Sequence, residues 1–183
     1  MTSESVFIDA FPFARQGSVR EGIVPIARLA RAAEDLPEQP EGEAGQVRWS
    51  VRGEVDATHQ SFLHLHVTAA PVLLCQRCMQ PFAYPIDSQV TMQLVKSESE
   101  LDADTFDEDD PEVDGPDKVL GTIRFDIMEQ VEDELVLCIP YVPKHDSCPG
   151  ELPAALVASS EAPSEEDQSE PSPFAVLAQL KKQ

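Results

Sequence analysis

Three stretches in the first hundred residues alternate apolar and polar side chains with a period of two, the pattern of half-buried β-strands. They are residues 47–52, 60–74 and 83–96, and their short connections predict an antiparallel meander. Shorter apolar runs at residues 5–9 and 18–24 predict two more strands, which gives a sheet of about five. The apolar positions of the three long stretches are Val47, Trp49 and Val51, then Leu63, Leu65 and Val67, and then Ile86, Val90, Met92 and Leu94.

Two other stretches have helical spacing. Residues 26–36 place apolar side chains at helical intervals between Pro25 and Pro37, which suit the start and the end of a helix. Residues 126–138 begin with Asp126, a good N-cap, and carry apolar residues on one face. We therefore predict an α+β fold, with two main helices packed on an antiparallel sheet. On the longer helix the apolar face consists of Ile127, Val131, Leu135 and Cys138, and the mostly solvated face of Glu129, Glu132, Asp133 and Glu134.

Aperiodic stretches divide the chain. Residues 1–150 are predicted to form the α+β domain, interrupted at 97–117 by a segment with eleven carboxylates and no basic residue. Such a segment cannot bury enough apolar surface to become ordered, so we expect a mobile acidic loop. Residues 151–171, rich in Glu, Ser, Ala and Pro, are predicted to be a disordered linker. Residues 172–183 form a short amphipathic segment, whose candidates for partner contact are Phe174, Leu177 and Leu180.

The charge balance narrows the class of partner. The 183 residues include 34 acidic and 13 basic side chains, and the formal net charge is −21. Binding to bare phosphate backbone needs clustered Lys and Arg, so naked RNA is disfavoured as the main ligand and a basic protein fits better. Residues 1–10 do not resemble a signal peptide, and no apolar run approaches the ~20 residues of a membrane span. We therefore expect a cytoplasmic protein without a membrane partner.

The spacing of the cysteines is the most specific sign of chemistry. Cys75 and Cys78 form a CxxC motif between two predicted strands, and His145 and Cys148 repeat that spacing after the long helix. Thiolate and imidazole ligands suit zinc better than magnesium or calcium, so the four residues together predict a Cys₃His zinc site. Two alternatives stay open. The residues are either ordinary thiols near the core or a thioredoxin-like redox pair, although such a pair normally opens a helix.

Arg77 lies between the two cysteines and is predicted to be an exposed cation on a rigid turn. It is a candidate for contact with RNA or a partner, and the alternative is a salt bridge to Glu132 or another neighbour. Cys138 on the apolar helix face is interpreted as a small buried residue. His64 and His66 are interpreted as polar residues on the exposed face of a strand.

The sequence has few features of an enzyme. The carboxylates in residues 129–134 would suit magnesium in a nuclease, but the solvent-exposed face of a helix is commonly acidic without binding a metal ion. The sequence has no P-loop, no dinucleotide-binding glycine motif, no nucleophile elbow and no HExxH motif. We therefore predict no enzymatic activity, no small-molecule substrate and no cofactor other than zinc.

Several segments resemble the bacterial YceD family. They are residues 75–82 (CQRCMQPF), 126–140 (DIMEQVEDELVLCIP), 143–148 (PKHDSC) and 173–182 (PFAVLAQLKK), in the order and with the spacing of the family. The resemblance implies a role in synthesis, processing or accumulation of large-subunit ribosomal RNA, and the family is not known for an enzymatic activity. Other branches of the family look richer in cysteine after the helix. His145 falls about where one of those cysteines stands, which implies a shared metal site with an altered ligand.

Charge and resemblance together indicate a non-enzymatic factor in ribosome biogenesis. Its partner would be a large-subunit ribosomal particle, a ribosomal protein or ribosomal RNA. Two rival functions remain. One is an acidic chaperone that holds a basic ribosomal protein through residues 97–117, and the other is a zinc- or thiol-dependent enzyme.

Overall fold

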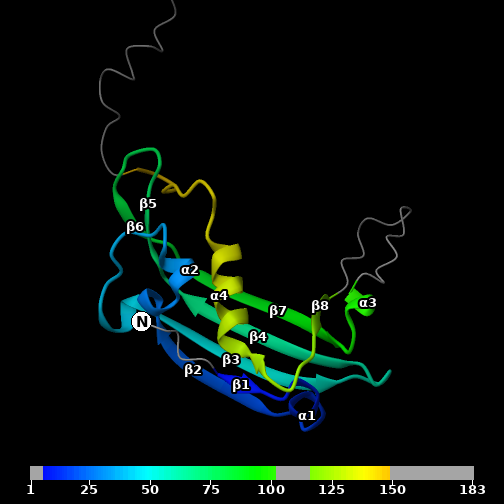
Figure 1. Ribbon diagram of the computed structural model, residues 1–183. Helices are drawn as coiled ribbons and strands as arrows, with labels where there is room; N and C mark the ends of the chain where they lie inside the picture. Colours follow the sequence, from blue (N-terminus) through cyan, green and yellow to red (C-terminus); the bar gives the residue numbers. More distant parts are fainter. Residues whose placement is uncertain (1–5, 102–115, 149–183) are drawn as a thin grey trace, which may run out of the picture. The chain divides into compact units, whose positions relative to one another are not determined.

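A five-stranded sheet forms the centre of the structure, in the order β2-β3-β4-β7-β8 (Figure 1). Neighbouring strands are antiparallel, except that β7 and β8 are parallel. The α+β prediction with a mostly antiparallel sheet of about five strands is confirmed. The strands are β2 (Val19–Pro25), β3 (Gln46–Val55), β4 (Ser61–Ala69), β7 (Ile86–Val95) and β8 (Asp117–Leu120).

The computed structural model describes residues 6–101 and 116–148. The predicted linker at 151–171 and the segment with Phe174, Leu177 and Leu180 lie outside the described residues, as does most of the acidic loop at 97–117. The two ends of that loop differ from the prediction, because α3 (Glu98–Leu101) and β8 are regular elements. No helix in the described ranges is long and apolar enough to cross a membrane.

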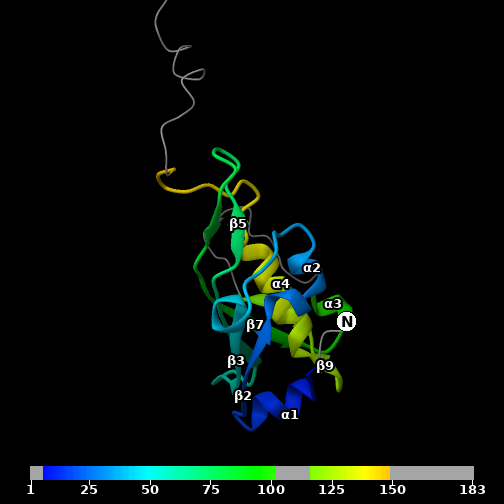
Figure 2. The same ribbon diagram turned by 90° about the vertical axis from the view of Figure 1, so that its left-hand side faces the viewer.

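One long helix, α4 (Ile127–Cys138), covers one face of the sheet (Figures 1 and 2). It packs on β4 and β7, where alternate side chains point inward, as the period of two predicts. Asp126 caps the helix as predicted, since its Oδ1 accepts from the N–H of Met128 at 2.9 Å. The buried residues that form this interface include Leu63, Leu65, Val67, Met92 and Leu94 of the sheet and Ile127, Val131 and Leu135 of the helix.

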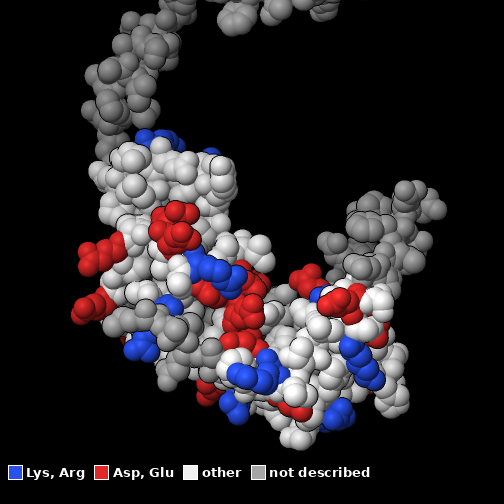
Figure 3. Space-filling model, viewed as in Figure 1, with Lys and Arg blue, Asp and Glu red and all other residues white. Residues whose placement is uncertain are grey.

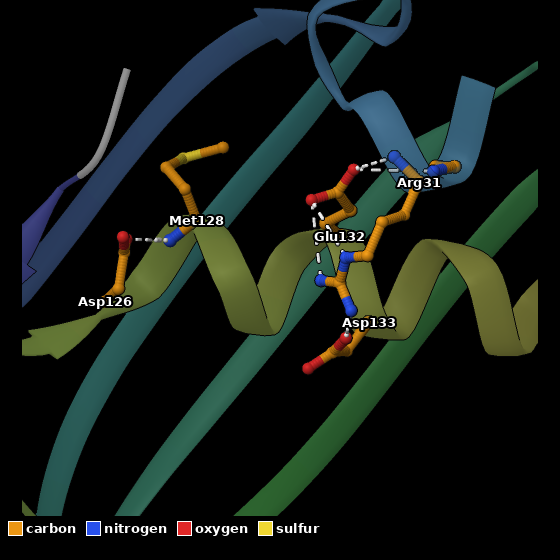
Figure 4. Close-up of polar contacts among 6 residues, drawn as sticks. Arg31, Asp126, Met128, Glu132 and Asp133 are labelled. Atoms are coloured by element: carbon orange, nitrogen blue, oxygen red, sulfur yellow. Dashed lines mark hydrogen bonds and ion pairs between the residues drawn. The ribbon is translucent and has the colours of Figure 1, made fainter. Parts of the chain in front are cut away.

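Residues 26–36 do not form the single helix predicted for them. A 3₁₀ turn, η1 (Ile26–Arg28), is followed by the extended residue Leu29, with φ −87° and ψ 91°, and α2 covers only Ala30–Ala33. Leu29 is fully buried, so tertiary packing outweighs helical spacing at this point. The N–H groups at the start of α2 bond instead to Glu132 of α4 (Figure 4).

Prolines interrupt two of the predicted strands. The stretch 60–74 divides at Pro71 into β4 and the short strand β5 (Val72–Leu74), and the stretch 83–96 divides at Pro85 into β6 (Pro81–Ala83) and β7. Proline cannot donate to a sheet ladder, which explains both breaks. β5 and β6 pair with each other as a separate two-stranded sheet beyond one end of the main sheet (Figure 1).

The N-terminal region differs from the prediction in two ways. The strand predicted at 5–9 is only β1 (Phe7–Ile8), and it pairs with β9 (Phe125–Asp126) outside the main sheet. A helix that the sequence analysis missed, α1 (Ala10–Arg15), follows it. The sequence analysis assigned no element to these residues. Pro12 is tolerated in the first turn of α1, where its missing N–H has no intrahelical role. α1 lies directly against β3, because a Cβ at Gly53 would be 2.6 Å from Ala14 Cα.

Candidate metal centre

The first half of the site is a tight turn between β5 and β6. The backbone N–H of Cys75 donates to the carbonyl of Gln80 at 3.0 Å, and the N–H of Met79 donates to the carbonyl of Cys75 at 2.8 Å. Met79 has a φ of 59°, a left-handed conformation that is uncommon for residues other than glycine. This conformation lets the chain reverse directly after the second cysteine of the motif.

The second half of the site is the loop that follows α4, and three hydrogen bonds attach it to the turn. The N–H of Gln76 donates to the carbonyl of Pro143 at 2.9 Å, and its Nε2 donates to the carbonyl of Tyr141 at 3.3 Å. Nη2 of Arg77 donates to the carbonyl of His145 at 3.1 Å. Two segments far apart in the sequence therefore lie side by side, at the same end of the structure in both ribbon views (Figures 1 and 2).

The side chains of Cys75, Cys78 and His145 converge between this turn and this loop. Their ligand atoms lie within 4.8 Å of one another, and Sγ of Cys78 is 3.4 Å from Nδ1 of His145. Two tetrahedral zinc ligands, with sulfur at ~2.3 Å and nitrogen at ~2.0 Å from the ion, are about 3.5 Å apart. The three residues thus have the donor chemistry and the spacing to hold a metal ion.

The ring of Phe82 in β6 packs against the imidazole of His145. Its ring centroid is 4.5 Å from that of His145, at an interplanar angle of 38°, and Phe82 in turn meets Tyr84 edge to face at 6.5 Å. Contacts behind a metal ligand fix its orientation and commonly affect metal affinity. Spacing alone assigned no role to Phe82, since an aromatic residue next to a strand reads as ordinary packing.

Cys75 is fully buried. Burial by itself raises the pKa of a thiol, but the backbone N–H groups of His145, Cys78 and Arg77 and the His145 side chain hydrogen-bond to this sulfur and lower its pKa to about 5. The thiolate is therefore the stable form at neutral pH, and the thiolate is the form that binds metal.

The other two cysteines differ in position. Cys148 is half-buried and follows His145 by three residues, and its part in the site stays a prediction. Cys138 of α4 donates from Sγ to Oε1 of Glu134 at 3.4 Å. Burial raises the pKa of the Cys138 thiol, and the adjacent Glu134 carboxylate raises it further. Cys138 is thus a protonated thiol outside the cluster.

Three of the four acidic residues of α4 are less solvated than predicted, whereas Glu129 is exposed as expected. Glu132 is only 8% exposed and bonds to Arg31, so it is not available as the partner proposed for Arg77 (Figure 4). Asp133 also pairs with Arg31, at 2.6 Å, and Glu134 accepts from Oγ of Ser88 at 2.5 Å. Three of the four carboxylates considered for magnesium therefore have partners within the protein.

The paired histidines lie where the sequence analysis placed them, on the polar face of the sheet. His64 Nδ1 is 3.1 Å from Oγ1 of Thr91, and His66 Nε2 is 2.7 Å from Oδ1 of Asp87. Hydrogen bonds to neighbouring strands explain both side chains.

Comparison with known proteins supplies the remaining observations. A family model described as "YceD: Large ribosomal RNA subunit accumulation protein YceD" matches residues 63–181. A protein of Haemophilus influenzae named "Large ribosomal RNA subunit accumulation protein YceD" is 36% identical over 109 residues, which cover 60% of this chain and 59% of that protein. The chain thus spans about three fifths of the length of that relative. No solved structure matches the chain.

Proposed function

Because this chain belongs to the YceD family, we propose that it is a non-enzymatic factor for synthesis, processing or accumulation of large-subunit ribosomal RNA. The observation that carries this proposal is the family match over residues 63–181, which includes the cysteine turn and α4. The relative from Haemophilus influenzae supports it, because its printed name describes accumulation of that RNA.

A zinc ion has a structural role in this proposal. Cys75, Cys78, His145 and Cys148 are the proposed ligands, and three thiolates with one imidazole form a closed set that leaves no position for a substrate. When bound, the ion supplies a fixed link between the β5–β6 turn and the loop after α4. The proposal is supported by the convergence of Cys75, Cys78 and His145, and by the lowered pKa of Cys75. The chain's own hydrogen bonds through Gln76 and Arg77 hold the same two segments together.

Charge favours a protein or a ribonucleoprotein particle over bare RNA as the direct partner. A net charge of −21 repels phosphate, whereas it speeds encounter with the basic proteins of the ribosome. The second candidate function, a chaperone for a basic ribosomal protein, is favoured by the eleven carboxylates in residues 97–117. In this function the acidic side chains cover the partner until RNA replaces them.

The test is the ratio of large-subunit to small-subunit ribosomal RNA in cells with and without the gene, with the full chain supplied in trans as the control. We expect the ratio to fall on deletion and to return with the full chain. An unchanged ratio in the deletion strain refutes the proposed function. A restored ratio after removal of residues 97–117 would show that the acidic segment, and hence the chaperone function, is not required.

A further inference from the structure

Exposed apolar side chains gather at one end of the protein. Among the described residues ten large apolar side chains are exposed, and six of them belong to two segments, residues 71–85 and 136–145. Tyr141 is 96% exposed, Leu137 79% and Met79 65%. Monomeric proteins rarely leave such a cluster open unless it binds something. We call this cluster the apolar end, and its members are Leu74, Met79, Val136, Leu137, Tyr141 and Val142.

The two segments of the apolar end are fixed relative to each other. The bonds from Gln76 to Pro143 and Tyr141 join the two segments that carry it. Both segments lie at the same end of the structure in the two ribbon views (Figures 1 and 2). A surface held in place before binding loses little conformational entropy when a partner docks.

Met79 gives a second indication that this surface is used. Its φ of 59° would suit glycine better, yet the chain has a methionine there with most of its side chain in solvent. Met is among the residues enriched in protein interfaces, so an exposed methionine at this position suits a docking surface.

Charge changes sharply at the border of the apolar end. The two segments together contain Arg77 and Lys144 but no carboxylate, although the chain has 34 acidic residues. Figure 3 shows the end over β5 and β6 as uncharged, with basic side chains at its edge, whereas acidic side chains lie next to it over α2 and α4. Along the exposed stripe of α4, Glu129 and Asp133 give way to Val136 and Leu137 within two turns.

Acidic side chains border the apolar end on a second side as well. Gln39 bonds through both its amide atoms to the backbone of Val72 in β5, which holds the loop after α2 against the hairpin. The exposed carboxylates of this loop, which begins at Glu34, the C-cap of α2, are Glu34, Asp35, Glu38 and Glu41. The apolar end is therefore bordered by acidic side chains on two sides.

From this arrangement we propose that the apolar end is the docking surface for a basic protein whose own apolar patch is surrounded by Lys and Arg. The inference rests on the proposed function, because ribosomal proteins supply partners of that chemistry. RNA fits less well, since two cations beside an acidic border neutralise few phosphates. A second copy of the chain fits less well too, because each copy carries a charge of −21.

The experiment titrates the labelled full chain with the separately purified proteins of the large ribosomal subunit. The double variant L137S/Y141S removes the two most exposed members of the surface, and I23S/I123S removes two isoleucines of similar exposure, 56% and 79%, outside it. We expect at least one basic protein to bind, L137S/Y141S to weaken that binding at least tenfold, and I23S/I123S to change it less than twofold. All four substituted positions are exposed, and urea unfolding checks that both variants fold.

Five results would overturn the docking surface. The first three are binding of no ribosomal protein, normal binding by L137S/Y141S, and equal loss in the two double variants. The other two are a loss by L137S/Y141S of binding to protein-free ribosomal RNA instead, and a wild-type dimer that L137S/Y141S converts to a monomer. The result that would refute the proposed function is different from the results that would refute the docking surface. A deletion strain with an unchanged RNA ratio refutes the function whatever the variants bind, whereas normal binding by L137S/Y141S refutes only the surface.

Discussion

The carboxylate of Glu132 in α4 accepts a hydrogen bond from the backbone N–H of Arg31 in α2, with an N–O distance of 2.7 Å (Figure 4). The same carboxylate accepts from the N–H of Ala32 at 3.4 Å and pairs with the Arg31 guanidinium. α2 has four residues and no capping side chain of its own. Glu132 therefore provides, from a distant part of the chain, what an N-cap residue normally provides locally.

We expect Glu132→Ala to destabilise the protein more than Glu132→Gln. Alanine leaves two backbone donors of α2 without this acceptor, which costs about 2–3 kcal/mol, whereas the glutamine carbonyl can still accept and its loss is about 1 kcal/mol. Asp133→Asn is the matched control. Its pair with the same arginine is solvent-exposed, so its loss should cost less than about 1 kcal/mol. Urea unfolding followed by the fluorescence of Trp49, the single tryptophan, measures all three variants.

The same contact shows what could be predicted of the fold. Alternation at Val47, Trp49 and Val51 and helical spacing from Ile127 to Cys138 predicted the main sheet and α4, because burial on one face leaves a periodic trace in the sequence. The break at Leu29 left no such trace. This break depends on the acceptor Glu132, about a hundred residues further along the chain, and the spacing of nearby residues cannot predict such a contact.

The candidate site was predictable to the same extent. The repeated spacing of Cys75 with Cys78 and of His145 with Cys148 predicted which residues meet, and the structure brings the first three together. Spacing does not encode the bonds from Gln76 or the ring contact of Phe82, because both depend on how the turn and the loop face each other. The sequence analysis did not predict the apolar end, because its members come from two distant segments that meet only in the folded chain.

The metal site makes a direct prediction. We expect the full chain, purified in the presence of zinc, to retain about one ion per chain. Cys75→Ser and His145→Ala should each lose it, because each removes one of the converging ligands. Cys138→Ser is the matched control, since this thiol lies outside the cluster and bonds to Glu134. Elemental analysis of the dialysed proteins measures the ratio, and equal loss in the Cys138 variant would contradict the assignment.

Phe82 should affect zinc affinity without binding the ion. Its ring packs on the His145 imidazole, so Phe82→Ala should leave the ligand free to rotate and weaken zinc binding about tenfold. Tyr84→Ala is the control. It removes an aromatic ring that meets Phe82 edge to face, and we expect it to leave the zinc affinity unchanged. Competition with a chromogenic chelator gives the dissociation constants, and unchanged affinity in Phe82→Ala would exclude the orienting role.

The turn between β3 and β4 should make a pH-dependent contribution to stability. The Thr58 hydroxyl, together with the N–H groups of Gln60 and Thr58, holds the pKa of Asp56 below its usual value. A carboxyl with a lowered folded-state pKa stabilises the protein above its unfolded pKa, about 4, and loses that contribution as the pH falls through the folded value. The stability gap between wild type and Asp56→Asn should therefore be present at neutral pH and shrink in acid.

The same comparison made in a Thr58→Ala protein tests whether hydrogen bonding lowers the pKa of Asp56. The Thr58 hydroxyl makes the largest contribution to the lowered pKa of Asp56, so in a Thr58→Ala protein the same gap should vary less with pH. Urea titrations at several pH values measure both pairs of proteins. A gap that is independent of pH in the wild-type background would show that the hydrogen bonds do not favour the charged carboxylate.

A substitution at Met79 should affect the free energy of unfolding and partner binding in opposite directions. Glycine adopts a φ of 59° without strain, so Met79→Gly should raise the free energy of unfolding by about 1 kcal/mol. The variant also loses a side chain of the apolar end, so it should bind the basic partner more weakly than wild type does. His59→Gly is the matched control. Its φ is 62°, in the turn between β3 and β4, so we expect the same gain in stability with unchanged binding. If Met79→Gly is stabilised and still binds as well as wild type, the methionine side chain is not part of the docking surface.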